Sequence, residues 1–137
     1  MARQGILDAD QLQGLIRRLS QVAFWSCVLV VAYLAFLPSE DAPGLTWDKA
    51  NHLLAFAVMT ALAAFGWPTR RSAFSLWVPL LGYGLLIEII QHVLPTREFS
   101  LLDWAADGLG ILAALGLIAL WRQWRSRYHS SAKPSTR

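Results

Sequence analysis

Four long apolar stretches constrain this chain more than any other feature of its sequence. Each is close to the roughly 20 residues that a helix rising 1.5 Å per residue needs to cross about 30 Å of hydrocarbon. Backbone groups in lipid must pair within their own segment, which favours helices. The predicted spans are residues 19–37, 49–67, 72–94 and 101–121. The sequence therefore predicts an all-α membrane protein with four transmembrane helices in a compact bundle.

The composition agrees with a membrane protein of one domain. Of the 137 residues, 55% are hydrophobic and only 15% are charged, which leaves too little polar surface for an ordinary soluble domain of this size. The formal charge of +3 would also fit a nucleic-acid partner. The positions of the basic residues indicate membrane orientation instead, so we expect no nucleic acid. Cys27 is the single cysteine, so no intramolecular disulfide is expected.

The basic residues predict the orientation of the four spans. Ten of the twelve Lys and Arg residues lie before the first span, between the second and third, or after the fourth. These ten are Arg3, Arg17, Arg18, Arg70, Arg71, Arg122, Arg125, Arg127, Lys133 and Arg137. Basic segments stay on the cytoplasmic side. Both termini are therefore expected in the cytoplasm, in a multi-pass protein of a bacterial cytoplasmic (inner) membrane.

The chain divides into three predicted parts. Residues 1–18 form a cytoplasmic N-terminal segment, and residues 19–121 form the four-helix domain. Residues 122–137 form a basic cytoplasmic tail, which is polar and expected to be disordered from Ser126 onward. Apolar residues on one helical face before the first span fit either a short helix on the inner membrane surface or the start of that span. A cleaved signal peptide is disfavoured, because the first apolar run exceeds the usual length of about 7–15 residues.

Polar side chains gather at the predicted outer ends of the second, third and fourth spans. Three pairs among them are spaced four residues apart, so that the members of each pair share a helix face. A charge within the hydrocarbon costs at least about 2.5 kcal/mol. The deepest carboxylates, Glu88 and Asp107, are therefore expected to face the bundle interior and to have partners there. The whole set comprises Asp48, Lys49, His52, Glu88, Gln91, His92, Arg97, Asp103 and Asp107.

Some of these residues also have simpler explanations. Asp48 and Asp103 stand at predicted helix starts, where a carboxylate can cap the helix by accepting backbone N–H bonds. Lys49 can extend toward the lipid head groups, and Arg97 can pair with the neighbouring Glu98. Each of these roles is structural and needs no ligand.

Two further signals concern helix packing. Small residues at positions 106, 110 and 114 form a ridge on the fourth span that would allow a neighbouring helix to approach closely. Pro79 interrupts the third span and predicts a kink there. Both signals are ordinary features of a helical membrane bundle.

The motifs "DKANHLLAF", "EIIQ" and "SLLDWAADGLG", with an Arg before the last, resemble the VanZ-like family of small bacterial membrane proteins. That family's pattern is D-K-x-x-H with a following Phe, then E-x-x-Q, then an Arg and an Asp leading into a glycine-containing helix. The resemblance covers residues 29–118, and the family is named for a protein associated with teicoplanin resistance. It implies a role in the cell envelope and a link to glycopeptide resistance. Asp107 departs from the pattern, where many members have Asn. The matching residues are Asp48, Lys49, His52, Phe56, Glu88, Gln91, Arg97, Asp103 and Gly110.

The preferred hypothesis is an outward-facing site for an anionic, lipid-linked substrate, with membrane lipids as partners and catalysis left open. His52 and Glu88 would form an acid/base pair, and Lys49 and Arg97 would hold a phosphate or carboxylate. The remaining residues would orient the substrate or these four side chains: Gln91, Asp48, Asp103 and Asp107.

Two alternatives remain beside the preferred hypothesis. The polar residues could form a non-catalytic network that fixes the bundle, in a structural or lipid-binding protein. They could also hold a metal through His52, Glu88, His92 and Asp107. Because Lys49 and Arg97 would repel a cation, no metal and no cofactor is expected. The oligomeric state is left open.

Overall fold

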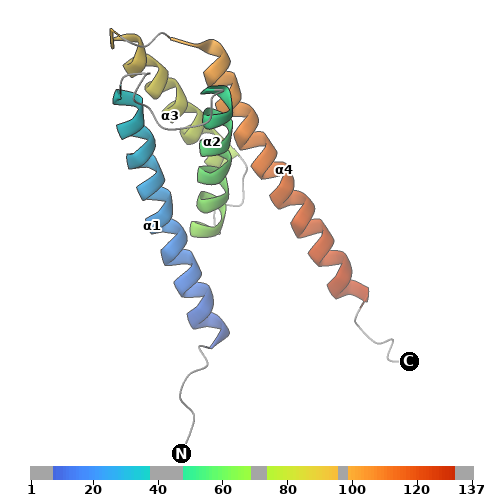
Figure 1. Ribbon diagram of the computed structural model, residues 1–137. Helices are drawn as coiled ribbons and strands as arrows, with labels where there is room; N and C mark the ends of the chain where they lie inside the picture. The colour runs from blue at the N-terminus through green and yellow to red at the C-terminus, as the bar shows by residue number, and fades with distance from the viewer. Residues whose placement is uncertain (1–7, 38–47, 69–73, 96–98, 132–137) are drawn as a thin grey trace, which may run out of the picture.

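The protein forms four α-helices that run alternately up and down (Figure 1). The computed structural model describes residues 8–37, 48–68, 74–95 and 99–131. All four helices are long and apolar enough to cross a membrane, so the chain is a multi-pass membrane protein, and the predicted fold class is confirmed. We call the end where α2 and α4 begin the cluster end. The helices are α1 (Ala9–Phe36), α2 (Asp48–Gly66), α3 (Phe74–His92) and α4 (Leu101–Ser131).

Helices α1 and α4 are longer than their predicted spans. Residues 9–18 form no separate helix but the first turns of α1. This helix begins after Asp8, whose backbone N–H donates to Gln11 Oε1 (3.2 Å). Helix α4 continues through Ser131, so the prediction of disorder from Ser126 was wrong for the described part of the tail. The reason is local, since residues 117–131 contain neither glycine nor proline, the two residues that most disfavour a helix.

The difference in helix length gives the molecule two projecting ends. At 1.5 Å per residue, α2 and α3 (19 residues each) are about 28 Å long, whereas α1 (28 residues) and α4 (31 residues) reach about 42 and 46 Å. Both long helices extend past α2 at the end opposite the cluster end (Figure 1). The projecting turns carry five arginines: Arg17, Arg18, Arg122, Arg125 and Arg127.

Helix α2 is the centre of the bundle and contacts all three other helices, most extensively α4. The close approach of α2 and α4 depends on Gly110, because a β-carbon there would overlap the backbone carbonyl oxygen of Leu53. Ala106 and Ala114, on the same ridge, are buried. The small residues on α4 thus allow α2 to approach closely, as their spacing predicts.

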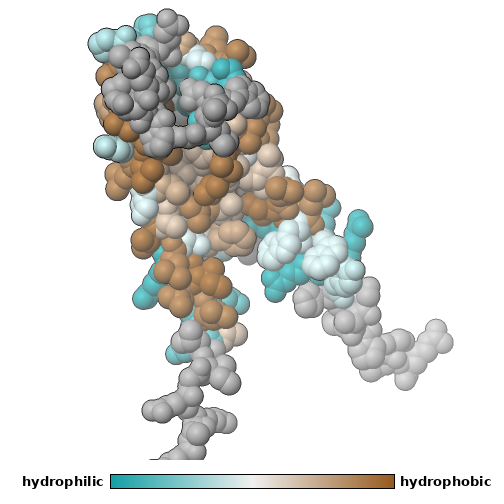
Figure 2. All heavy atoms as spheres, in the orientation of Figure 1, coloured by the Kyte–Doolittle hydropathy of each residue, from teal (hydrophilic) through white to brown (hydrophobic). Residues whose placement is uncertain are grey.

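The core is apolar, and so is much of the outer surface. Phe56, Met59, Leu80 and Ile111 form the main buried cluster between the helices. Many large apolar side chains point outward, as expected for side chains that contact lipid rather than water (Figure 2). Helix α3 remains helical on both sides of Pro79, where the sequence predicts a kink.

Candidate functional site

Five polar side chains from three helices meet at the cluster end. Lys49 and His52 come from the first turns of α2, Glu88 from the last turns of α3, and Asp103 and Asp107 from the first turns of α4. We call these five side chains the polar cluster. Glu88 and Asp107 are fully buried. Because the helices alternate in direction, residues far apart in the sequence are brought to one level of the bundle.

His52 is held by Asp107. The Nδ1 atom of His52 lies 2.9 Å from Asp107 Oδ1, across the contact between α2 and α4. The sequence predicted that Asp48 orients His52 or Lys49, and the Asp48 side chain lies outside the described residues. Asp107 reaches His52 because the ridge of small residues on α4 brings its backbone close to α2.

Lys49 pairs with Asp103, with Nζ 3.2 Å from Oδ1. The expectation that Asp103 caps α4 was wrong, because the cap is Ser100, whose Oγ accepts the backbone N–H of Asp103 (3.2 Å). Asp103 lies at the third helical position and is free to turn toward α2. Arg97, the partner expected for Asp103, lies outside the described residues.

Glu88 is bound through one of its two oxygens. The backbone N–H of Ser100 donates to Glu88 Oε2 at 2.8 Å, which fastens the end of α3 to the start of α4. A backbone N–H just before a helix is a strong donor to a carboxylate, and this bond offsets part of the cost of burying Glu88. Ser100 therefore contributes twice to the site, as a cap and as a donor.

The polar cluster has more acceptors than donors among the described residues. Three buried carboxylate oxygens accept no hydrogen bond there: Glu88 Oε1, Asp103 Oδ1 and Asp107 Oδ2. The contact of Asp103 Oδ1 with Lys49 is an ion pair without hydrogen-bond geometry. Three carboxyl groups thus face one lysine and one histidine. Buried oxygens in this condition are costly and are satisfied by a cation, by ordered water or by a donor from a ligand.

The other predicted site residues lie around the polar cluster or outside the described part. Gln91 is buried on α3, one turn after Glu88 and on the same side of the helix. His92 is exposed, its ring lies edge-on to that of Phe99 with the centroids 6.3 Å apart, and it is not among the residues whose ligand atoms lie close together. Of the sequence-based set, the structure therefore joins Lys49, His52, Glu88, Asp103 and Asp107.

Sequence reasoning missed two contributors to the site. Ser100 could have been found, because Ser100 and Asp103 have the spacing of a capping motif. Gly84 gave no signal: it lies on α3 against Asp107 Oδ2, where a β-carbon would overlap that oxygen. Phe56 lies below the polar cluster, with its ring 6.1 Å from that of Tyr83, and separates the polar cluster from the rest of the bundle.

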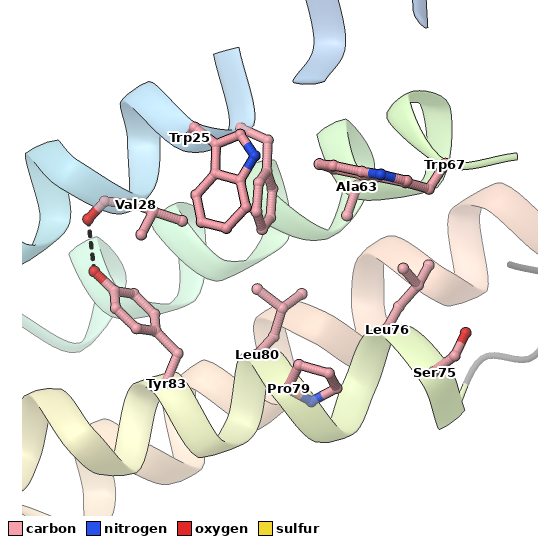
Figure 3. Close-up of a pocket in the computed structure, with 10 residues that line it drawn as sticks. Trp25, Val28, Ala63, Trp67, Ser75, Leu76, Pro79, Leu80 and Tyr83 are labelled. Atoms are coloured by element: carbon pink, nitrogen blue, oxygen red, sulfur yellow. Dashed lines mark hydrogen bonds between the residues drawn. The ribbon is translucent and has the colours of Figure 1, made fainter. Parts of the chain in front are cut away.

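A cavity lies on the far side of this aromatic pair, between α1, α2 and α3 (Figure 3). Its volume is about 270 Å³, and its walls are mainly apolar, with Trp25, Trp67, Pro79 and Leu80 among them. Tyr83 closes the end nearest the polar cluster by donating from its hydroxyl to the carbonyl of Val28 (2.6 Å). The cavity is therefore a mainly apolar space between three helices that are long and apolar enough to cross a membrane.

Comparisons with known proteins give one relative. No family model and no solved structure matches the sequence. "Uncharacterized protein C11E3.10" of the fission yeast Schizosaccharomyces pombe (strain 972 / ATCC 24843) is 33% identical over 115 residues. The aligned part covers 80% of this chain and 68% of the yeast protein.

Proposed function

This chain belongs to the same family as C11E3.10 of Schizosaccharomyces pombe, and we propose that its polar cluster binds the head group of an anionic lipid or lipid-linked phosphate. One observation carries the proposal: charged side chains from three spans converge at one end of the bundle, with Lys49 about one-third exposed at the rim. Charges buried at a membrane level are costly and mark functional sites by default.

The orientation proposed for the bundle places the polar cluster at the outer leaflet. The projecting ends of α1 and α4 carry five arginines, and basic segments remain in the cytoplasm. Both termini then lie in the cytoplasm of a cell that carries the protein in its cytoplasmic membrane. Lipid head groups of the outer leaflet lie at the level of Lys49.

The roles of the side chains follow from their contacts. Lys49 holds the anionic group of the ligand, since its ammonium is the accessible cation among the described members of the polar cluster. His52, oriented by Asp107, and Glu88 are the pair that would move a proton if the protein is an enzyme. The resemblance to the VanZ-like family supports a cell-envelope ligand. A relative in a fungus favours a lipid phosphate that both kinds of cell contain over a target confined to bacteria.

A purely structural network is the second candidate, and the interhelical bonds favour it. His52–Asp107, Lys49–Asp103 and Ser100–Glu88 tie α2, α3 and α4 together without any ligand. Such bonds stabilise membrane proteins by only about 0.6 kcal/mol each on average. This candidate does not explain the buried oxygens Glu88 Oε1 and Asp107 Oδ2, which accept no hydrogen bond from the described residues.

Native mass spectrometry of protein released from mild detergent tests the proposal. Lys49→Met is compared with the wild type and with Arg122→Met, which removes a cation from the opposite end. The wild type and Arg122→Met are expected to retain one anionic lipid, and Lys49→Met is expected to lose it, by about tenfold or more in occupancy, equivalent to about 1.4 kcal/mol. Equal lipid retention in all three proteins would favour the structural network.

A further inference from the structure

We propose that His52, Glu88 and Asp103 form a binding site for a divalent transition-metal ion. One potential ligand atom from each of these residues lies within 4.8 Å of the other two. The proposal goes beyond lipid binding, because a metal ion could occupy the polar cluster with or without a lipid. It also differs from the set considered from sequence alone, in which His92 and Asp107 were ligands.

The separation of the ligand atoms is close to what a metal requires. Nitrogen and carboxylate oxygen ligands lie about 2.0–2.2 Å from zinc, so three of them around one ion are about 3–3.5 Å apart. From a separation of up to 4.8 Å, the ligand atoms of His52, Glu88 and Asp103 need to close by up to about 1.3–1.8 Å.

The unpaired oxygens are the second observation that points to a cation. Glu88 is fully buried, and its Oε1 accepts no hydrogen bond from the described residues. Asp103 is 8% exposed, and its Oδ1 atom also accepts no hydrogen bond, although it forms an ion pair with Lys49. With three carboxyl groups against one lysine and one histidine, a divalent ion would bring the described polar cluster closer to neutrality.

The hydrogen bonds of His52 and Glu88 orient both side chains and leave one atom of each available to a metal ion. Asp107 accepts from Nδ1 of His52, which leaves Nε2 of the neutral ring with a lone pair. A carboxylate that orients a metal-binding histidine through its other nitrogen is a recurrent arrangement in metalloproteins. The Ser100 N–H likewise fixes one oxygen of Glu88 and leaves the other. Asp107 is thus a positioning residue.

The kinds of ligand atom select the kind of ion. One imidazole nitrogen and two carboxylate oxygens suit zinc, manganese or ferrous iron. Magnesium and calcium prefer oxygen ligands alone. Three protein ligands also leave a position open, as in catalytic rather than structural zinc sites.

Lys49 competes with the ion. Its ammonium lies 3.2 Å from Asp103 Oδ1, an oxygen that would be a ligand of the metal. The Lys49 side chain is one-third exposed, so it can rotate outward when an ion binds. Removing this cation therefore favours the metal, so Lys49→Met is expected to bind metal more tightly than the wild type. The same substitution is expected to lose lipid, so failure of one proposal is distinguishable from failure of the other.

Titration of the purified full-length protein with Zn²⁺, followed calorimetrically after chelator treatment, tests the site. The wild type is expected to bind one ion. Glu88→Gln and Asp103→Asn are each expected to weaken binding by about 100-fold, and Asp107→Asn by about 10- to 100-fold through loss of orientation. His92→Asn, which alters an exposed histidine outside the polar cluster, is the matched control and is expected to bind as the wild type does.

Three results would overturn the site. They are the absence of a stoichiometric Zn²⁺ ion in the wild type, unchanged affinity in both Glu88→Gln and Asp103→Asn, and loss of binding in His92→Asn. Circular dichroism of each variant separates lost affinity from lost fold. Lys49→Met is expected to bind Zn²⁺ more tightly than the wild type does. A variant that unfolds would lose Zn²⁺ binding, so unfolding cannot produce this result.

Discussion

The two fully buried carboxylates of the polar cluster are stabilised in different ways. Asp107 meets an imidazole from a neighbouring helix, and Glu88 meets a backbone N–H that precedes a helix. A bond to a charged acceptor contributes about 1.5–3 kcal/mol, but each residue keeps one oxygen without such a bond among the described residues. The positions of Glu88 and Asp107 therefore depend on close packing against neighbouring residues as much as on hydrogen bonds.

Gly84 is the residue whose substitution tests these surroundings. A β-carbon there would overlap Asp107 Oδ2 and come within 3.2 Å of the Phe56 ring, and both neighbours are buried. Gly84→Ala is expected to destabilise the protein by about 1–3 kcal/mol, as overpacking does. Thermal unfolding in detergent, followed by circular dichroism, measures the change.

Gly82 provides the matched control on the same helix. Nothing lies within 4 Å of a β-carbon built at Gly82, so Gly82→Ala is expected to be neutral or slightly stabilising, because alanine is the better helix former. Equal melting temperatures for the two variants would show that Asp107 and Phe56 yield easily, and that Gly84 does not hold Asp107 in place.

The members of the polar cluster were predictable from the sequence, but their partners were not. Spacing by four places His52 on one face of its helix and Asp107 on one face of another. It does not say which two helices touch. The two residues are 55 positions apart, and their contact follows from the packing of α2 on α4.

At the scale of the elements, the contact between α2 and α4 determines the geometry of the site. It brings Lys49 to Asp103 and His52 to Asp107. The contact is close because Gly110 faces the Leu53 carbonyl, a backbone atom that cannot rotate away. A substitution on this ridge is therefore expected to separate the two pairs even though it is distant from the charged groups.

Gly110→Ala tests this dependence. The added carbon is expected to push α2 and α4 apart, to lower the melting temperature and to weaken any ligand binding that needs both helices. Gly116→Ala on the same helix, where nothing lies within 4 Å of the new β-carbon, is the control and is expected to behave as the wild type does. A Gly110→Ala protein with unchanged stability and binding would mean that the ridge is not required.

The existence of the four helices was predictable, and their full lengths were not. Hydropathy identifies the part of each helix that lies in lipid, and the predicted spans of α2 and α3 differ from the observed helices by two residues or fewer at each end. Outside lipid, helix ends depend on caps and on helix propensity. Asp8 begins α1, and the run without glycine or proline continues α4 to Ser131.

At the scale of the molecule, the distribution of charge separates two ends. The start of α1 and the end of α4 project from the same end of the bundle and carry five arginines, and the polar cluster lies at the other end (Figure 1). This arrangement predicts which residues a reagent outside the cell can reach. Single cysteines in a Cys27→Ser background, labelled with a membrane-impermeant maleimide, provide the measurement.

His92→Cys is expected to be labelled in intact cells, because His92 is exposed at the cluster end. Asp10→Cys and Ser126→Cys, both at exposed positions of the projecting ends, are expected to be labelled only after the cells are opened. The reverse labelling pattern would mean that the bundle has the opposite orientation, with the polar cluster on the cytoplasmic side. Labelling of Asp10→Cys and Ser126→Cys from different sides would contradict the up-and-down arrangement itself.

The unequal helix lengths have a consequence for the surrounding lipid. Two helices of about 28 Å stand beside two that are much longer, so the short side of the bundle does not fully match a hydrocarbon layer of about 30 Å. Lipids adapt to such hydrophobic mismatch by thinning locally, while the arginines of α1 and α4 prevent the protein from sinking. Thinning by about 2 Å next to α2 and α3 would bring the lipid phosphate groups slightly closer to Lys49 at the rim of the polar cluster. The helix lengths would then assist the binding of a head group, in addition to the charges of the polar cluster.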